Sequence, residues 1–284
     1  MKIKTLIMGT CLISGISTSA IIAQTSGCAP SSSQFDFSVN KVRTTLLGGG
    51  DQFFDLKSAK YEVPKGSGKN PIYGGAIWIG GYGKENVLKT AGQTYRQRGN
   101  DFWPGPISTD ANNNSVANQC IDYDKHFFVS RAEIDAFKKS NVISDNIKNW
   151  PGNDANNHPL APYVDIDKNG IYEPIKGDYP KINGDGMAWW IYNDIGNIHR
   201  VFDNETKIGI EIRQSTYAFN LPYAGLDQAL FQHYQLRYTG TDTLDNTFVG
   251  IWLDPDLGNA ADDYIGCDPS QHLCYVYNGD DNDE

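Results

Sequence analysis

Runs of residues that alternate between apolar and polar side chains recur along this chain, and they limit its fold more than any other feature. A period of two is typical of β-strands, in which successive side chains point to opposite faces of a sheet. The runs are GGAIWIGGY, KHFFVS, AWWIYND, KIGIEIRQSTYAF, ALFQHYQLRYTG and DNTFVGIWLD. In KIGIEIRQ, Ile208, Ile210 and Ile212 share one face, and Glu211 and Arg213 take the other. This pattern predicts a sheet with one solvated side.

The last three of these predicted strands follow one another without a helix between them. Their connectors, NLPYAGLDQ and TGTDTLDN, are short. Parallel strands need a long crossover, which is usually helical, so we expect antiparallel pairing. In the middle strand Leu230, Tyr234, Leu236 and Tyr238 fall near one face. The expected fold is mainly β, an antiparallel β-sandwich.

The sequence predicts one short helix, in SRAEIDAFKKS. Ser130 and Glu133 have the spacing of a capping box, and Ile134 and Phe137 mark one apolar face. The surrounding stretch, from about residue 99 to 162, is rich in Pro, Gly and Asn. We expect a loop-rich insertion that carries this helix.

The first residues, MKIKTLIMGTCLISGISTSAIIAQ, have Lys2 and Lys4 before an apolar stretch. This order is typical of a secretory signal peptide, and we expect residues 1–23 to be removed. No later stretch approaches about 18 apolar residues, so we expect no integral membrane segment after signal removal. Residues 24–284 would form one β-rich extracellular module, or alternatively two subdomains with a junction near residue 180.

The chain is acidic, with 34 Asp and Glu against 24 Lys and Arg and a formal net charge of −10. Such a charge argues against binding to phosphate backbones, so we expect no nucleic-acid partner. The final YNGDDNDE directly follows a strand-like YVY. We expect it to begin a linker within a longer protein, and a solvated acidic tail is the alternative.

Four cysteines remain after the signal peptide, and export permits disulfides. Cys267 and Cys274 bracket CDPSQHLC, in which Pro269 and a polar tip indicate a tight turn. We predict a disulfide between these two residues, with two unpaired buried cysteines as the alternative. The sequence leaves the pairing of Cys28 and Cys120 open.

The clearest chemical motif is the segment DIDKNGIYEPIKGD. Its oxygen-bearing side chains recur at every second position, and Gly170 permits a sharp bend, as in loops that wrap around calcium. Lys176 stands where an EF-hand has a bidentate Glu, and Pro174 forbids a flanking helix, so the motif resembles dockerin or thrombospondin-type loops. An Asx-turn loop without an ion is the alternative. The predicted calcium ligands are Asp165, Asp167, Asn169, Ile171 through its carbonyl, Glu173 and Asp178.

A second acidic group, DPDLGNAADDYIGCD, is a weaker candidate for a metal site. Carboxylates this dense repel one another unless a cation, hydrogen-bond donors or water surrounds them. Solvated turns are the alternative, and two of these carboxylates could also serve a glycosidase as acid and base. The candidate ligands are Asp254, Asp256, Asn259, Asp262 and Asp263.

Other catalytic motifs do not occur in the mature sequence. The five histidines are scattered without HExxH, and GxSxG does not occur, so we assign no catalytic residue. Four of the six tryptophans lie in predicted strands and are expected in the core. Trp103 and Trp150 lie in WPG loops and are the candidates for a sugar-stacking surface.

Several strings resemble, in their combined order, the N-terminal region of large exported proteins of Bacteroidota. They are TYRQRGNDFWPGP, YDKHFFVSRAEIDAF, NWPGN, APYVDIDKNGIYEPIKGDYP, AWWIYNDIGNIH, WLDPDLGNAADDYIGCD and YNGD. Proteins of this kind commonly end in a type IX secretion sorting domain; these 284 residues include none, which fits the expectation that they are part of a longer protein. The resemblance implies a secreted or cell-surface location and no particular reaction.

Together these features predict an exported, calcium-stabilised β-rich module of a surface protein, acting in adhesion or as a scaffold. Its expected partners are glycans or other surface proteins. The alternative is a secreted carbohydrate-binding module or a component of a glycoside hydrolase.

Overall fold

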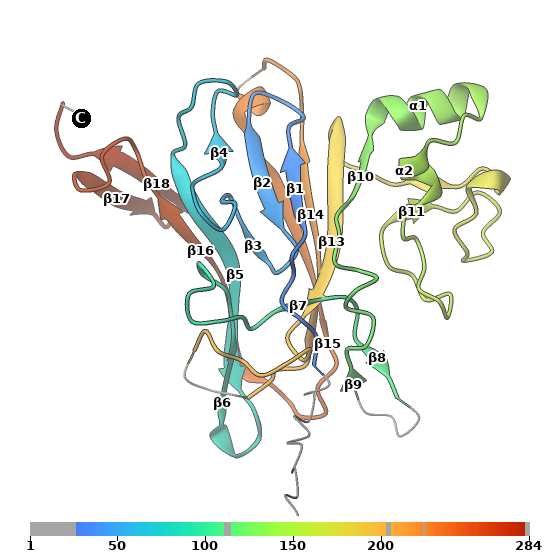
Figure 1. Cartoon of the computed structure of the whole chain (residues 1–284), viewed down its shortest axis with the longest axis horizontal. Helices are drawn as coiled ribbons and strands as arrows, with labels where there is room; N and C mark the ends of the chain where they lie inside the picture. The colour runs from blue at the N-terminus through green and yellow to red at the C-terminus, as the bar shows by residue number, and fades with distance from the viewer. Residues whose placement is uncertain (1–26, 111–114, 203–205, 224, 282–284) are drawn as a thin grey trace, which may run out of the picture.

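The computed structural model describes residues 27–110, 115–202, 206–223 and 225–281. Within these ranges two antiparallel sheets stack face to face (Figure 1). This arrangement confirms the mainly β, sandwich-like fold expected from the period-two pattern. The predicted signal peptide lies outside the described residues.

The first sheet has seven strands in the described residues. They are β1 (Gln34–Phe37), β2 (Arg43–Leu47), β3 (Asp51–Gln52), β4 (Tyr61–Glu62), β5 (Ile72–Tyr82), β6 (Leu88–Ala91) and β16 (Asp245–Pro255). The order is β1-β2-β3-β5-β16, with β4 paired to β2 and β6 paired to β5. Strand β16 therefore forms one edge of this sheet.

The second sheet has five described strands. They are β7 (Trp103–Pro104), β10 (Phe127–Ser130), β13 (Gly186–Asn193), β14 (Ile210–Ala218) and β15 (Phe231–Tyr238). The order is β10-β13-β14-β15, and β7 pairs with β13. Both sheets combine strands from before and after residue 180, so that position does not separate one sheet from the other.

Short strand pairs and helices lie outside the two main sheets. The pairs are β8 (Ser108–Thr109) with β9 (Ser115–Val116), β11 (Tyr163–Val164) with β12 (Tyr179–Pro180), and β17 (Asp263–Asp268) with β18 (Leu273–Asn278). The helices are α1 (Arg131–Ser140), α2 (Asp145–Lys148) and the 3-10 turns η1 (Lys84–Asn86), η2 (Pro174–Lys176) and η3 (Leu226–Gln228).

Helix α1 begins with the capping box that the sequence predicts. The Ser130 hydroxyl accepts the Glu133 N–H at 3.3 Å, and the Glu133 carboxylate accepts the Ser130 N–H at 2.9 Å. Ile134 and Phe137 are buried, as their spacing indicates. Helix α2 was not predicted, because its single turn is too short to show a periodic pattern.

Strand β13 has a core on each of its faces. Ala188, Trp190 and Tyr192 contribute to the core between the two sheets, whereas Trp189 and Ile191 contribute to a second core with the insertion. All eight residues of β13 are consequently buried. The insertion and the residues beside it supply to the second core Val129, Ile134, Phe137, Ile147, Trp150 and Leu160.

The predicted solvated side of β14 is wrong. Glu211, expected on that side, is fully buried, and its carboxylate accepts the Ile107 N–H at 2.8 Å. It also pairs with Arg213 at 2.8 Å and Arg237 at 3.1 Å. Arg213 in turn donates to the Pro159 carbonyl at 2.9 Å. The insertion covers this face, and the local alternation of β14 contains no information about a covering segment.

The two loop tryptophans are also buried, which corrects their prediction as an exposed sugar-stacking surface. Trp103 is 2% exposed and Trp150 is 3% exposed. Trp103 packs beside a disulfide that joins Cys28 to Cys120, and the Trp150 indole donates to the Pro162 carbonyl at 3.0 Å. A large apolar ring in a loop can anchor that loop to the core, and both indoles do so here.

Cys28 and Cys120, whose pairing the sequence leaves open, form a disulfide with each other. The predicted disulfide between Cys267 and Cys274 is not present. Cys267 and Cys274 are exposed free thiols. The turn between them forms as predicted, and they lie directly opposite each other on β17 and β18. The short spacing in the sequence correctly predicted that the two cysteines lie close together. Closeness alone does not establish a disulfide bond.

Candidate metal centre

The predicted calcium loop is closed by a short pair of strands. Residues 163–164 of β11 pair with residues 179–180 of β12 in antiparallel register. Asp165 directly follows the first strand and Asp178 directly precedes the second. The pairing therefore holds these two acids together at the neck of the loop, although they are far apart in the motif.

Asp178 is the buried member of the site. Its side chain is fully enclosed, and one carboxylate oxygen accepts the Ile166 N–H at 2.8 Å. The other oxygen accepts the Glu173 N–H at 2.9 Å. These bonds fix the carboxylate between the two sides of the loop.

Asp165 and Asp167 complete a cluster with Asp178. One oxygen from each of these three residues lies within 4.8 Å of the others. Asp165 also accepts the backbone N–H of Gly170 at 2.7 Å, where the glycine has a φ of +80° that favours residues without a side chain. The hydrogen bond from Gly170 lowers the pKa of Asp165, which favours its charged form.

The donor set of this cluster fits a hard divalent cation. Calcium and magnesium bind carboxylate oxygens, and three converging carboxylates repel one another without positive charge between them. Among the described residues, no other group of three or more His, Cys, Asp or Glu side chains has this spacing. The cluster therefore could hold a metal ion.

The other three predicted ligands lie in the same loop, where Asn169 and Glu173 have polar partners. The Asn169 side-chain oxygen accepts the Ile171 N–H at 2.7 Å, and its amide donates to Asp167 and Glu173. Ile171 is 37% exposed. The Glu173 carboxylate lies 2.5 Å from the Lys176 ammonium. Each polar side chain thus has a partner inside the loop.

Lys176, to which the sequence analysis gave no role, has ionic partners within the loop. Its ammonium pairs with Glu173 and lies 3.9 Å from Asp167. The hydrogen bond to Glu173 raises the pKa of Lys176, and the same contact lowers the pKa of Glu173. Lys176 therefore supplies positive charge beside the acids. The three-residue spacing from Glu173 was the available signal.

The second predicted acidic group lies between the end of β16 and the start of β17. Asp254 accepts a hydrogen bond from the Tyr95 hydroxyl, and the Asn259 side chain accepts the Ala261 N–H at 3.2 Å. Asp263 accepts the Leu257 N–H at 2.8 Å. Burial and the nearby charges of Asp263 and Asp254 raise the pKa of Asp256.

Some oxygens of this second group are buried without a hydrogen-bond partner among the described residues. One carboxylate oxygen in each of Asp256, Asp262 and Asp263 is in this state, and so is the side-chain oxygen of Asn278. Asn278 lies directly opposite Asp263 on the neighbouring strand. A buried oxygen without a donor is costly, and a cation is one way to satisfy several at once.

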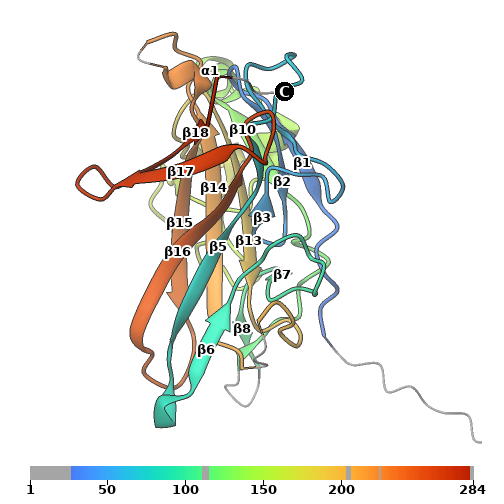
Figure 2. The same ribbon diagram turned by 90° about the vertical axis from the view of Figure 1, so that its left-hand side faces the viewer.

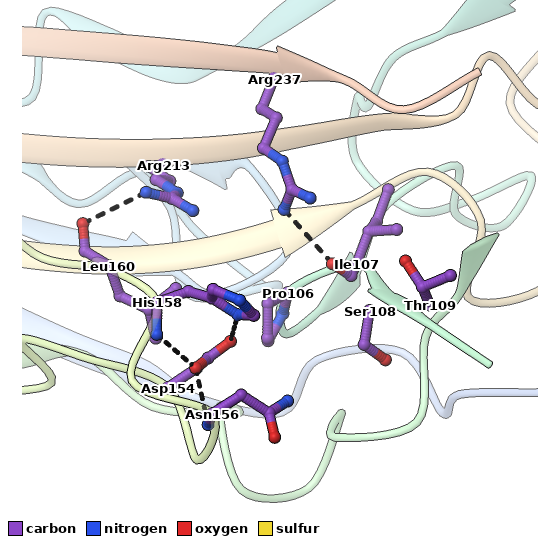
Figure 3. Close-up of a pocket in the computed structure, with 10 residues that line it drawn as sticks. All are labelled: Pro106, Ile107, Ser108, Thr109, Asp154, Asn156, His158, Leu160, Arg213 and Arg237. Atoms are coloured by element: carbon purple, nitrogen blue, oxygen red, sulfur yellow. Dashed lines mark hydrogen bonds and ion pairs between the residues drawn. The ribbon is translucent and has the colours of Figure 1, made fainter. Parts of the chain in front are cut away.

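A cavity of about 400 Å³ lies beside the insertion, with Arg213, Arg237 and His158 in its lining (Figure 3). Its cationic groups already have acidic partners. Both arginines contact Glu211, and His158 lies 3.0 Å from Asp154. The cavity therefore offers no unpaired positive charge to an anionic ligand.

Comparisons of the chain with protein-family models, curated proteins and solved structures found no match. Within the described ranges, no helix has both the length and the apolar character needed to cross a membrane.

Proposed function

We propose that this chain is an exported, calcium-stabilised β-rich module of a cell-surface or secreted protein, with an adhesion or scaffold role. The observation that carries the proposal is the convergence of Asp165, Asp167 and Asp178 in a loop closed by paired strands. Calcium suits this set because it accepts flexible arrangements of oxygen ligands, whereas magnesium demands near-ideal octahedral geometry.

The ion would act on the loop rather than on a substrate. The cluster lies at the neck of a surface loop that packs against the second core through Tyr163 and Tyr172. A bound cation would join the two sides of this neck and reduce the repulsion between its carboxylates. Extracellular modules of this kind commonly bind calcium at about 10⁻⁴ to 10⁻³ M.

The acidic group around Asp263 is the second candidate for calcium. The unpartnered oxygens favour Asp256, Asp262, Asp263 and Asn278 as its ligands, in place of Asp254 and Asn259. The sequence strings that resemble exported Bacteroidota proteins support a secreted or surface location.

The carbohydrate-binding alternative has less support. The two loop tryptophans that motivated it are buried. The half-buried Trp78 and Trp252 stack on each other, with ring centroids 6.1 Å apart and planes 4° from parallel. Each ring also packs edge-on against another aromatic ring, Phe202 for Trp78 and Tyr95 for Trp252, so both indoles are engaged within the protein.

Thermal unfolding of residues 24–284 in calcium and in chelator tests the proposal. At a calcium concentration ten times the dissociation constant, binding should raise the Tm by about 3 to 6 °C for a chain of this size. Asp167→Asn should reduce this shift, and the matched control Asp122→Asn, which removes the same charge at an exposed site, should not.

Calorimetric titration gives the stoichiometry. Two ions per chain would support both candidate calcium sites. One ion that is lost in Asp167→Asn would support the site at Asp165, Asp167 and Asp178 alone. Equal Tm values in calcium and chelator would refute the calcium proposal. Reproducible binding on a glycan array would instead favour the carbohydrate-binding alternative over the scaffold role.

A further inference from the structure

Strand β16 presents an unpaired edge to its surroundings. It pairs with β5 on one side, and no described strand pairs with it on the other. An edge strand exposes a row of backbone N–H and C=O groups that can pair with another strand. At 11 residues, β16 is longer than most strands, and proteins usually keep such edges short or cover them.

The side chains of β16 that face the interior of the sandwich are exposed. Val249 and Ile251 lie opposite Ile79 and Ile77, which belong to the main core. Ile77 and Ile79 are 0% and 3% exposed, but Val249 and Ile251 are 51% and 48% exposed. Leu253, two positions further on the same face, is 45% exposed. The core therefore continues onto β16 without being covered there.

The edge strand of the other sheet has the same property. In β15, Leu236 and Tyr238 lie opposite Ile212 and Ile210, which are buried in the main core. Leu236 and Tyr238 are nevertheless 37% and 39% exposed. In Figure 2, β15 and β16 both lie toward the left of the view, with β16 beside β5 and in front of β15. The apolar interior is thus open along the side where both sheets end.

The segment that carries β16 is acidic, although Lys84 and Lys69 of neighbouring segments line cavities together with Asp245 and Asp256. Residues 241–281, which contain β16, β17 and β18, include nine aspartates and neither Lys nor Arg. Asp245 stands at one end of β16, and Asp254 and Asp256 stand at the other. A second copy of the chain, docked through the same surface, would bring like charges together, which is unfavourable. The complementary partner is therefore basic.

We propose that the β16 edge is a docking site for an extended strand of a partner protein that alternates apolar residues and carries Lys or Arg near its ends. Its backbone would continue the seven-stranded sheet beyond β16. Its apolar side chains would cover Val249, Ile251 and Leu253, and its basic ends would lie near the aspartates. Strand addition of this type gains affinity from main-chain hydrogen bonds and specificity from alternate side chains.

This docking site is separate from the cation loop. In Figure 1 the β17–β18 hairpin that follows β16 projects at one end of the molecule, and β11, which begins the cation loop, lies toward the other end. The docking proposal therefore does not require that the loop from Asp165 to Asp178 bind calcium. Asp256 also belongs to the second calcium candidate, and for that reason peptide binding is measured in chelator.

The test uses two synthetic peptides with blocked termini, KVTVKVTVK and EVTVEVTVE, which share strand propensity but differ in charge. Binding to residues 24–284 is measured in chelator by fluorescence anisotropy of labelled peptide. The lysine peptide should bind saturably and about tenfold more tightly than the glutamate peptide, and the difference should shrink with added salt. Amide hydrogen exchange should slow along β16.

Ile251→Ser should weaken binding of the lysine peptide by about tenfold, because it removes apolar surface from the interior face. Phe248→Ser is the matched control, since Phe248 is 77% exposed on the opposite face of the same strand. Equal binding of both peptides, no binding of either, or protection outside β16 would overturn the proposal. Sedimentation that shows a dimer of the chain, abolished by Ile251→Ser, would also overturn it.

Discussion

Replacement of Arg96 by methionine should strongly destabilise the sandwich. Arg96 donates to both carboxylate oxygens of Asp51, at 2.6 and 2.7 Å, and to the Ser31 carbonyl at 2.5 Å. The Asp51 side chain is 0% exposed and that of Arg96 is 11% exposed. Without the guanidinium, the Asp51 carboxylate stays buried and loses its only ion-pair partner among the described residues.

The expected cost follows from this burial. Removal of one partner from a buried ion pair typically costs about 3 to 5 kcal/mol, because an uncompensated charge remains inside the protein. For a chain of this length, such a loss lowers the Tm by about 6 to 20 °C. Replacement of both partners by apolar residues, Asp51→Leu with Arg96→Met, should recover most of the loss, because no buried charge remains.

Urea denaturation followed by tryptophan fluorescence measures the two single variants and the double variant. The chain offers a matched control in Arg43, which binds Asp36 through the same two nitrogens, with both side chains more than half exposed. Arg43→Met should leave the denaturation midpoint nearly unchanged. The reasoning is refuted if Arg96→Met costs no more than Arg43→Met, or if the two single losses simply add in the double variant.

Three further outcomes can be measured on the same material. Replacement of Cys28 and Cys120 by serine should cost about 4 to 5 kcal/mol in denaturant, because their bond closes a loop with a sequence separation of 92 residues; no loss would contradict this. Burial lowers the pKa of His126 to about 3, so stability should fall as the pH drops from about 6.5 toward 3, and His126→Phe should flatten the pH profile of the denaturation midpoint. Lys176→Gln should tighten calcium binding in calorimetric titration, since it releases Glu173 and removes positive charge beside the loop; unchanged or weaker binding would contradict this.

The sequence predicts those features that local residues determine. The six alternating runs became β5, β10, β13, β14, β15 and β16, and the capping box of α1 formed at Ser130. The convergence of acids in the calcium loop could be predicted for the same reason, since Asp165, Asp167 and Asp178 lie within one motif. Its spacing gave the three acids that converge.

The features that the sequence did not predict depend on distant segments. Glu211 is buried because the insertion covers β14, and nothing within the strand indicates this cover. Cys28 and Cys120 meet because the chain returns after 92 residues. Trp103 lies in a stretch whose composition suggests an exposed loop, but it forms β7, which pairs with β13 and is buried beside that disulfide.

Strand β13 has one consequence for the way this protein tolerates change. Trp189 and Trp190 are neighbours in sequence, but one belongs to the core of the insertion and the other to the core between the sheets. A slip of one residue in the pairing of β13 would exchange every side chain between the two cores. Neither layer can therefore be rearranged or deleted alone, and we expect the sandwich and its insertion to unfold in a single transition.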